Sequence, residues 1–261
     1  MGTIVVTAHE QAVFQVTIDR PASRNAFDGP LIEEWCRRLA ALAARSPRAV
    51  VVTGAGDTFC AGYDVREIDP HQDPALPHPD ARFERVLHAV IELPCPVVAA
   101  VNGDAFGGGL DLALACDLCV AAPTARLAMT PCRLGLVYSA DGIARFITRL
   151  GAPLTRRLFL AAVPLDAAEL ARSGAVELAA SRDAVLLRAL ELATRIASNA
   201  PLAVRGIRTT IAAVERTLAQ NLPEETRALL RELRVQALQS DDLKEGLAAF
   251  AQKRAPKFRG E

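Results

Sequence analysis

The sequence has no surplus of charge of either sign, because thirty basic and thirty acidic side chains give a formal net charge of zero. Proteins that bind nucleic acid use a positive surplus to displace counterions from phosphates, so this class of partner is not expected. Net charge does not describe how charge is distributed. A local basic patch could therefore still meet the acidic groups of a small ligand.

Long apolar runs are absent as well. No stretch reaches about 18 uninterrupted apolar residues, so no membrane-spanning helix is predicted. The first residues, MGTIVVTAHEQ, lack the basic segment and the long apolar core of a signal peptide. Val6 stands where a myristoylation motif needs Ser or Thr. We therefore expect a cytoplasmic protein.

The patterns of a metal site or a disulfide framework are also missing. Cys116 and Cys119 have C-x-x-C spacing, but there is no second pair and no histidine nearby. Small, buried, reduced cysteines are therefore the favoured interpretation. His71 and His78 lie in DPHQDPALPHPD, whose prolines and aspartates predict a loop. Neither a metal ligand nor a cofactor is predicted.

What the chain does have is the composition of a globular protein. Of its 261 residues, 51% are apolar and 23% are charged, which excludes intrinsic disorder. This length suits one large α/β domain, or one domain with a small addition.

The N-terminal part alternates strands and helices. Thr3–Ala8 and Val13–Asp19 are β-branched runs that predict a hairpin. Apolar residues that share one helical face follow the cap signal at Asp28. Ala49–Thr53 and Pro96–Val101 predict buried strands, Ala81–Leu93 predicts a helix, and the strand-then-helix order continues through Asn102–Val120.

From about Ile147 onward the pattern is almost entirely helical. The predicted helices are Thr155–Ala162, Ala167–Ser173, Asp183–Ala197, Pro201–Ala219, Glu224–Leu238 and Asp241–Lys253. A break near Ser198–Pro201 divides the chain into a core domain, residues 1–198, and a C-terminal helical region, residues 199–261.

Two glycine-containing turns each follow a buried strand. The first is FCAGYD, residues 59–64, and the second is VNGDAFGGGLD, residues 101–111. Consecutive glycines let backbone amides approach a ligand, and the free N–H groups of a following helix would point at it. Neither turn is a P-loop or a G-x-G-x-x-G dinucleotide fingerprint. Each turn alone is also compatible with simple tight packing.

Together the two turns resemble the enoyl-CoA hydratase/isomerase (crotonase) superfamily. The resemblance also covers TIDRPASRNAF near the start and EGLAAFAQKRAPKF near the end. It implies an α/β fold of repeated ββα units, with two roughly perpendicular sheets. It also implies a C-terminal helical region that forms trimers and commonly hexamers. The substrate would be an acyl-CoA thioester, with coenzyme A as part of the substrate and no separate cofactor.

The resemblance also assigns residues to the site. The backbone N–H groups of Ala61 and Gly108 would form an oxyanion hole, which stabilises the negative charge of a thioester enolate. Phe250 and Lys253 match the positions through which a neighbouring subunit touches CoA. The CoA-binding set implied by the resemblance is Arg24, Ala61, Gly62, Asp64, Gly107, Gly108, Phe250 and Lys253.

The acid/base residues of hydratases in this superfamily are two glutamates. Here the first position is Asp111, one methylene shorter, and the second aligns with Pro131, which cannot transfer a proton. Addition of water by two carboxylates therefore lacks half of its machinery.

The segment MTPCRLGLVYSADGI, residues 129–143, resembles the methylmalonyl-CoA decarboxylase branch, where Tyr138 matches a characteristic tyrosine. Decarboxylation of a malonyl-type thioester needs no base. It needs the carboxylate held perpendicular to the thioester plane, and a phenol can orient it. Asp141 and Arg145 are further candidate pocket residues.

The sequence therefore favours a decarboxylase of a short, branched malonyl-type CoA, with Ala61, Gly108, Asp111 and Tyr138 as catalytic residues. One alternative is an enoyl-CoA hydratase/isomerase or an acyl-CoA hydrolase that uses Asp111. A second alternative is a CoA-binding subunit without catalysis.

Overall fold

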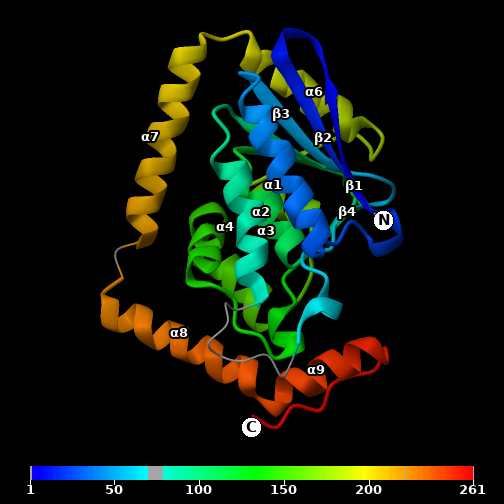
Figure 1. The fold of residues 1–261 in the computed structure, drawn as a ribbon, viewed down its shortest axis with the longest axis vertical. Helices are drawn as coiled ribbons and strands as arrows, with labels where there is room; N and C mark the ends of the chain where they lie inside the picture. The colour runs from blue at the N-terminus through cyan, green and yellow to red at the C-terminus, as the bar shows by residue number, and fades with distance from the viewer. Residues whose placement is uncertain (1, 70–78, 221, 261) are drawn as a thin grey trace.

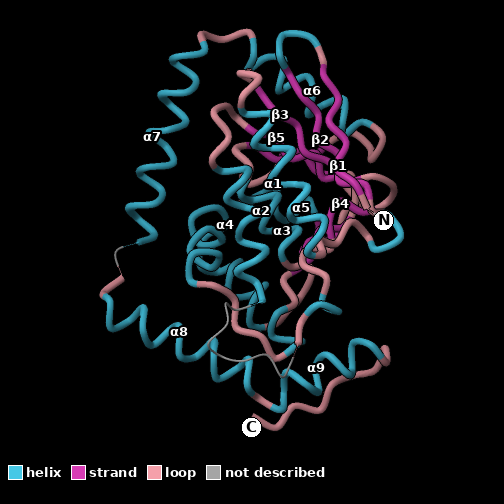
Figure 2. Tube along the Cα trace, viewed as in Figure 1, coloured by secondary structure: helices cyan, strands magenta, loops and turns pink. Residues whose placement is uncertain are grey.

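The computed structural model describes residues 2–69, 79–220 and 222–260, and builds them around two β-sheets (Figure 1). The larger sheet has six strands and the smaller one four. Figure 2 shows the strands gathered in the upper right part of the view, with α1 to α4 below them and to the left. His71 and His78 lie outside the described residues.

The larger sheet begins with the predicted hairpin. β1 (Thr3–Ala8) and β2 (Val13–Asp19) pair antiparallel, and the remaining pairs are parallel. Parallel strands buried on both faces are continuous apolar runs, as the sequence letters AVVVTG and VVAAV show. The strand order is β1-β2-β3-β5-β7-β10, with β3 at Ala49–Gly54, β5 at Val97–Val101, β7 at Leu118–Ala121 and β10 at Glu177–Leu178.

The smaller sheet consists of very short strands. β4 (Thr58–Cys60), β6 (Asp104–Phe106) and β8 (Arg126–Ala128) pair in parallel, and β9 (Leu165–Asp166) adds antiparallel to β8. Segments of two or three residues carry no readable alternation of apolar and polar positions. For this reason the sequence predicted the glycine-containing turns next to these strands but did not predict the strands themselves.

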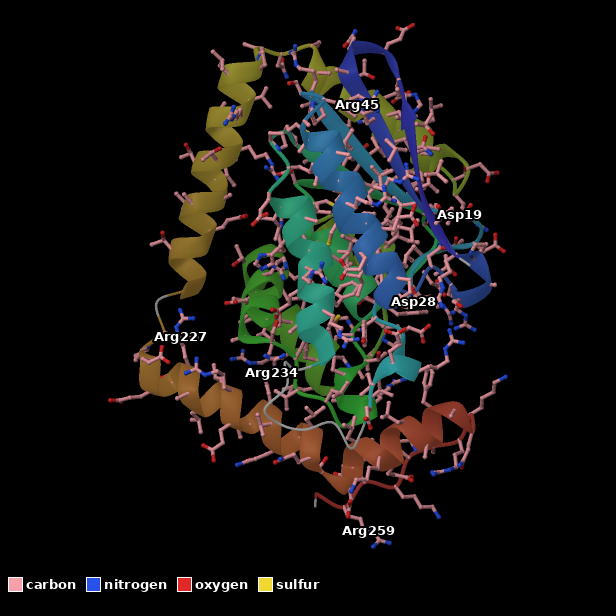
Figure 3. The ribbon with its side chains drawn as sticks, viewed as in Figure 1. Asp19, Asp28, Arg45, Arg227, Arg234 and Arg259 are labelled. Atoms are coloured by element: carbon pink, nitrogen blue, oxygen red, sulfur yellow. The ribbon has the colours of Figure 1, made fainter. Side chains whose placement is uncertain are left out.

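Helix α1 (Gly29–Ala43) matches its prediction closely. The Asp28 side chain, labelled in Figure 3, accepts a hydrogen bond from the Leu31 amide and caps the helix. Its predicted apolar face is buried, and the Trp35 indole donates to the Val86 carbonyl of α2 (Pro79–Ile91) at 3.1 Å. This contact joins α1 to α2.

Helix α4 (Ala140–Leu160) begins earlier than the sequence predicted. The Ser139 hydroxyl accepts a hydrogen bond from the Gly142 amide and starts the helix, and Gly151 interrupts its helical dihedral angles. The predicted helix Thr155–Ala162 corresponds to the part of α4 after Gly151. The part before Gly151, which carries Arg145, was not predicted as a separate helix. Helices α3 (Gly108–Ala115), α5 (Ala167–Arg172) and α6 (Ala184–Ala197) complete the core.

The C-terminal helices lie at the periphery. In Figure 1, α7 (Pro201–Gln220) runs along one side, and α8 (Glu224–Gln239) and α9 (Asp241–Ala251) cross the lower end. Apolar side chains on α7 are exposed, including Leu202 at 82%. The break after α6 coincides with the predicted domain boundary, but the division into two regions and the trimerisation role remain predictions.

A membrane-spanning helix and a metal site each have requirements that the described residues do not meet. Within residues 2–69, 79–220 and 222–260, no helix combines the length and apolar character needed to span a bilayer. The six cysteines are free, and the part of the chain that the structure describes holds no group of three or more residues suited to bind a metal ion.

Candidate active site

Two turns of the chain meet because their strands are neighbours in the smaller sheet. β4 pairs with β6, with Thr58 opposite Asp104 and Cys60 opposite Ala105. The turns that follow these strands, 61–64 and 107–109, therefore lie at the same edge of the sheet. A Cβ atom on Gly62 would lie 2.7 Å from the Gly108 nitrogen, which shows how closely the two turns pack.

The N-terminus of α3 faces this meeting point. The amides of Leu110 and Asp111 donate to the Gly107 carbonyl, so the amides of Gly108 and Gly109 are the first-turn donors that the helix itself leaves unused. A Cβ atom on Gly108 would lie 2.4 Å from Cε1 of Phe83. Position 108 therefore has no room for a side chain, and the role of the Gly108 amide as an oxyanion donor stays a prediction.

Ala61 is a correction to the predicted site. Its N–H donates to the Arg24 carbonyl at 3.0 Å, so this amide is already occupied. The Gly62 amide points toward the Cys60 sulfur at 3.3 Å. Among the described residues, no hydrogen-bond acceptor is found for the next amide, that of Tyr63.

The direction of the Tyr63 amide follows from a parallel bridge with Phe27. Phe27 donates to the Gly62 carbonyl and accepts from the Asp64 amide, so the Tyr63 N–H points away from Phe27. The amides of Tyr63 and Gly108 are thus two donors at this meeting point for which the described residues supply no acceptor. The sequence pointed to Ala61 and not to Tyr63. The hydrogen bond that occupies the Ala61 amide goes to the carbonyl of Arg24, 37 positions earlier, and no local pattern shows it.

Asp64 fixes the end of the first turn. Its carboxylate accepts hydrogen bonds from Arg66 and Arg20, and the Arg66 bond has the largest effect in lowering its pKa to about 2. The Asp64 side chain is nearly buried.

Arg24 is exposed and contributes its backbone carbonyl to the turn. Asn25, which sequence analysis overlooked, is fully buried and donates to three carbonyls of residues 55–59.

We expect Asp64→Asn to lower the free energy of unfolding at pH 7 by about 1.5–3 kcal/mol, the range for hydrogen bonds to a charged group. The folded pKa lies below the usual value of 3.8. The stabilisation is therefore complete above that value and is lost as the pH falls toward 2. Urea unfolding at several pH values should show the wild type and the variant converging in acid. Asp57→Asn is the matched control, because the Asp57 side chain is 88% exposed and should show little difference at any pH.

Asp111 lies one turn into α3 and is held by two side chains from the α4 region. The Tyr138 hydroxyl donates to Oδ2 at 2.8 Å. Arg145 contributes Nε at 2.6 Å from Oδ1 and Nη2 at 3.2 Å from Oδ2. The Asp111 side chain is 0% exposed. Asp111, Tyr138 and Arg145 thus form one hydrogen-bonded unit, which is called the carboxylate triad below.

The carboxylate triad changes the predicted role of Asp111. A general base must reach the proton that it removes, directly or through one water. A carboxylate without exposed surface, paired at two points with a guanidinium, does not meet this condition in the structure. The interaction with Arg145 spans 34 positions and was not visible in the sequence.

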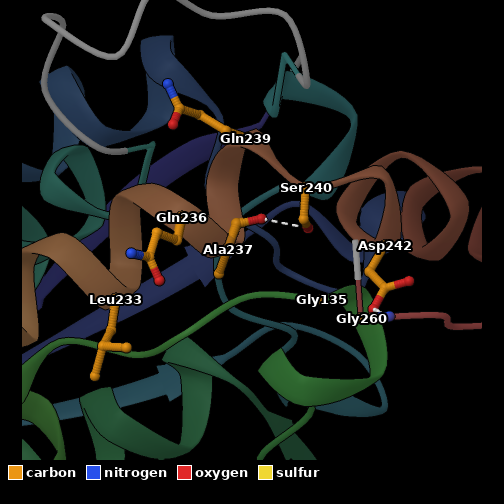
Figure 4. Close-up of a pocket in the computed structure, with 8 residues that line it drawn as sticks. All are labelled: Gly135, Leu233, Gln236, Ala237, Gln239, Ser240, Asp242 and Gly260. Carbon is orange, nitrogen blue, oxygen red and sulfur yellow. Dashed lines mark hydrogen bonds between the residues drawn. The ribbon is translucent and has the colours of Figure 1, made fainter.

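A cavity of about 560 Å³ lies between Gly135 and the junction of α8 with α9 (Figure 4). It is lined by Gly135, Leu233, Gln236, Ala237, Gln239, Ser240, Asp242 and Gly260. The predicted catalytic residues are not among these. Phe250 lies near the end of α9 and Lys253 lies two residues beyond it, and both are exposed and take no part in the carboxylate triad.

Comparison with known proteins adds sequence evidence to this geometry. Residues 8–261 match the family model described as enoyl-CoA hydratase/isomerase. The chain is 33% identical to the 2,3-dehydroadipyl-CoA hydratase of Escherichia coli (strain K12), over 98% of both chains. It is 31% identical to the carnitinyl-CoA dehydratase of Proteus mirabilis (strain HI4320), over 95% of both chains.

Solved structures show the same architecture. A methylmalonyl-CoA decarboxylase in complex with 2-nitronate-propionyl-CoA superposes with a TM-score of 0.91 over 99% of both chains. Its sequence identity is 24%, so this likeness concerns the fold. An enoyl-CoA hydratase/isomerase from Pseudoalteromonas atlantica T6c gives a TM-score of 0.82 at 32% identity, covering 98% of this chain and 100% of the other.

Proposed function

The chain belongs to the enoyl-CoA hydratase/isomerase family, and we propose that within this family it decarboxylates a short, branched malonyl-type acyl-CoA. Membership makes it a crotonase-superfamily enzyme acting on acyl-CoA. The finer proposal rests on one observation, the engagement of Asp111 in the carboxylate triad. Pro131 stands where hydratases of the superfamily carry a second glutamate, so the site has no accessible carboxylate at either position.

Decarboxylation needs no carboxylate base and can use the backbone amides of the two turns. Cleavage of the bond between Cα and the carboxylate leaves its electron pair on the thioester as an enolate, and CO₂ departs. The amides of Tyr63 and Gly108 are the donors suited to the enolate oxygen. Preorganised donors of this kind stabilise charge that develops in the transition state. A proton then adds to Cα and gives the saturated acyl-CoA.

Tyr138 is the group proposed to orient the substrate carboxylate. Its phenol sits between α3 and the start of α4, and its ring packs on Phe159 at a centroid distance of 5.5 Å. Without substrate the O–H donates to Asp111. A substrate carboxylate beside Tyr138 would offer it a second acceptor.

Hydration is the second candidate, because two curated relatives are named a hydratase and a dehydratase. In that case Asp111 would have to leave Arg145 and meet water. Incubation with malonyl-, methylmalonyl-, ethylmalonyl- and crotonyl-CoA, followed by mass spectrometry, separates the candidates. Loss of CO₂ supports the proposal, gain of water by crotonyl-CoA contradicts it, and binding without turnover indicates a non-catalytic subunit.

We also propose that the enzyme is cytoplasmic and works as a homotrimer or hexamer, with Phe250 and Lys253 completing the CoA site of a neighbour. Phe250 is 60% exposed at the end of α9, which suits contact outside its own chain. Removing α9 would not test this cleanly. Leu243 on α9 is fully buried, so truncation would also disturb the fold.

We expect Lys253→Gln to raise KM for acyl-CoA roughly tenfold with little change in kcat, because a hydrogen bond to a charged phosphate is lost. Lys244→Gln is the control. It removes the same charge from α9, the helix that precedes Lys253, where Lys244 pairs with Asp241 at 2.7 Å. Steady-state kinetics checks both variants, and an equal KM for the two would refute the role of Lys253.

A further inference from the structure

Asp111 depends on its protein partners for hydrogen bonding. Its side chain is 0% exposed, while that of Arg145 is 20% exposed. In the described part of the chain, its carboxylate accepts two hydrogen bonds from Arg145 and one from Tyr138. In the folded site this carboxylate has no surface exposed to solvent, and a buried charge without partners is strongly unfavourable.

Arg145 remains a cation in this setting. Burial acts to lower its pKa, but the charge and the hydrogen bonds of Asp111 outweigh burial and raise the pKa above its ordinary value. The carboxylate of Asp141 on α4 also raises the pKa of Arg145. The guanidinium therefore holds Asp111 as a permanent partner.

Tyr138 differs from Arg145 because it has one proton to donate. A phenol O–H rotates about its C–O bond and serves one acceptor at a time. If it turns from Asp111 to a substrate carboxylate, Asp111 still accepts both guanidinium hydrogen bonds. Without Arg145 the same rotation would leave a buried carboxylate with no partner, and the O–H would stay on Asp111.

We infer that Arg145 is a positioning residue that lets the Tyr138 hydroxyl move from Asp111 to the substrate carboxylate. This inference rests on the proposed decarboxylation. It assigns Arg145 an effect on turnover without direct contact with the substrate. It also makes the effects of Arg145 and Tyr138 interdependent, because one acts through the other.

The test is a double-mutant cycle with Arg145→Ala and Tyr138→Phe. Arg145→Ala should lower kcat on methylmalonyl-CoA by roughly ten- to a hundredfold, as the loss of the Tyr138 hydrogen bond does, with KM nearly unchanged. In the Tyr138→Phe background the same substitution should lower kcat less than about twofold, because the hydroxyl that it controls is gone.

Arg149→Ala is the matched control. Arg149 lies one turn further along α4 and donates to the Leu114 and Cys116 carbonyls at the other end of α3. Its loss should lower stability, and any effect on kcat should be the same with tyrosine or phenylalanine at position 138. If Arg145→Ala does not fold, Arg145→Lys takes its place. A lysine keeps the charge without the two-point geometry, so its smaller loss should also vanish in the Tyr138→Phe background.

The inference would be overturned if the loss of kcat in the double variant equalled the product of the losses in the two single variants. Wild-type kcat in a folded Arg145→Ala enzyme would overturn it as well. Failure of the proposed function gives a different result. In that case the wild type itself releases no CO₂, and the inference falls with it.

Discussion

Replacing Gly108 by valine is expected to lower turnover by about a hundredfold or more, the usual cost of losing one oxyanion donor. A Cβ atom at this position would lie 2.4 Å from Cε1 of Phe83. Phe83 is buried and contacts the Phe27 ring edge-on at 5.8 Å, so it has little freedom to move. The added side chain should therefore shift the amide of residue 108. Steady-state kinetics with near-UV circular dichroism would separate lost activity from lost folding.

Gly29→Val is the matched control for this variant. Gly29 is the first residue of α1, as Gly108 is of α3. A Cβ atom there would meet only Glu67 Oε2, at an ordinary distance of 3.6 Å. We expect near wild-type kinetics for the control. The same result for a folded Gly108→Val enzyme would remove the assignment of this amide to the oxyanion hole.

Replacing Tyr138 by phenylalanine is expected to slow decarboxylation by roughly ten- to a hundredfold, because one hydrogen bond to a charged group is lost. The substitution keeps the ring, and with it the packing on Phe159. Single-turnover rates on methylmalonyl-CoA measure the chemical step.

The affinity of the Tyr138→Phe enzyme for propionyl-CoA provides the internal control. This product of the proposed reaction has no free carboxylate, so its dissociation constant should stay the same. A decarboxylation rate equal to that of the wild type would show that the hydroxyl does not hold the substrate carboxylate.

Local periodicity was sufficient to predict the hairpin β1–β2 and helix α1, because each buries one regularly spaced face. It did not predict the smaller sheet, whose strands have two or three residues. The start of α4 was missed as well, because its cap at Ser139 precedes a segment without a strong apolar run.

The site residues also separate into those with a local sequence signal and those without one. The resemblance assigns Gly108 from its glycine-rich turn, and the helix that follows leaves its first amides unused, but the role of this amide stays a prediction. The roles of Ala61 and Asp111 depend on distant partners, the Arg24 carbonyl and the Arg145 guanidinium. Hydrogen bonds between residues 34 or 37 positions apart are set by the tertiary fold, and no local motif encodes them.

The most direct test of the account is the fate of methylmalonyl-CoA and crotonyl-CoA, mixed with the wild-type enzyme in heavy water and followed by mass spectrometry. An enolate formed by loss of CO₂ takes its new proton at Cα from the solvent or from an exchangeable group. The account predicts propionyl-CoA with a single deuterium at Cα, and unchanged crotonyl-CoA. Intact methylmalonyl-CoA together with crotonyl-CoA that has gained heavy water would contradict it.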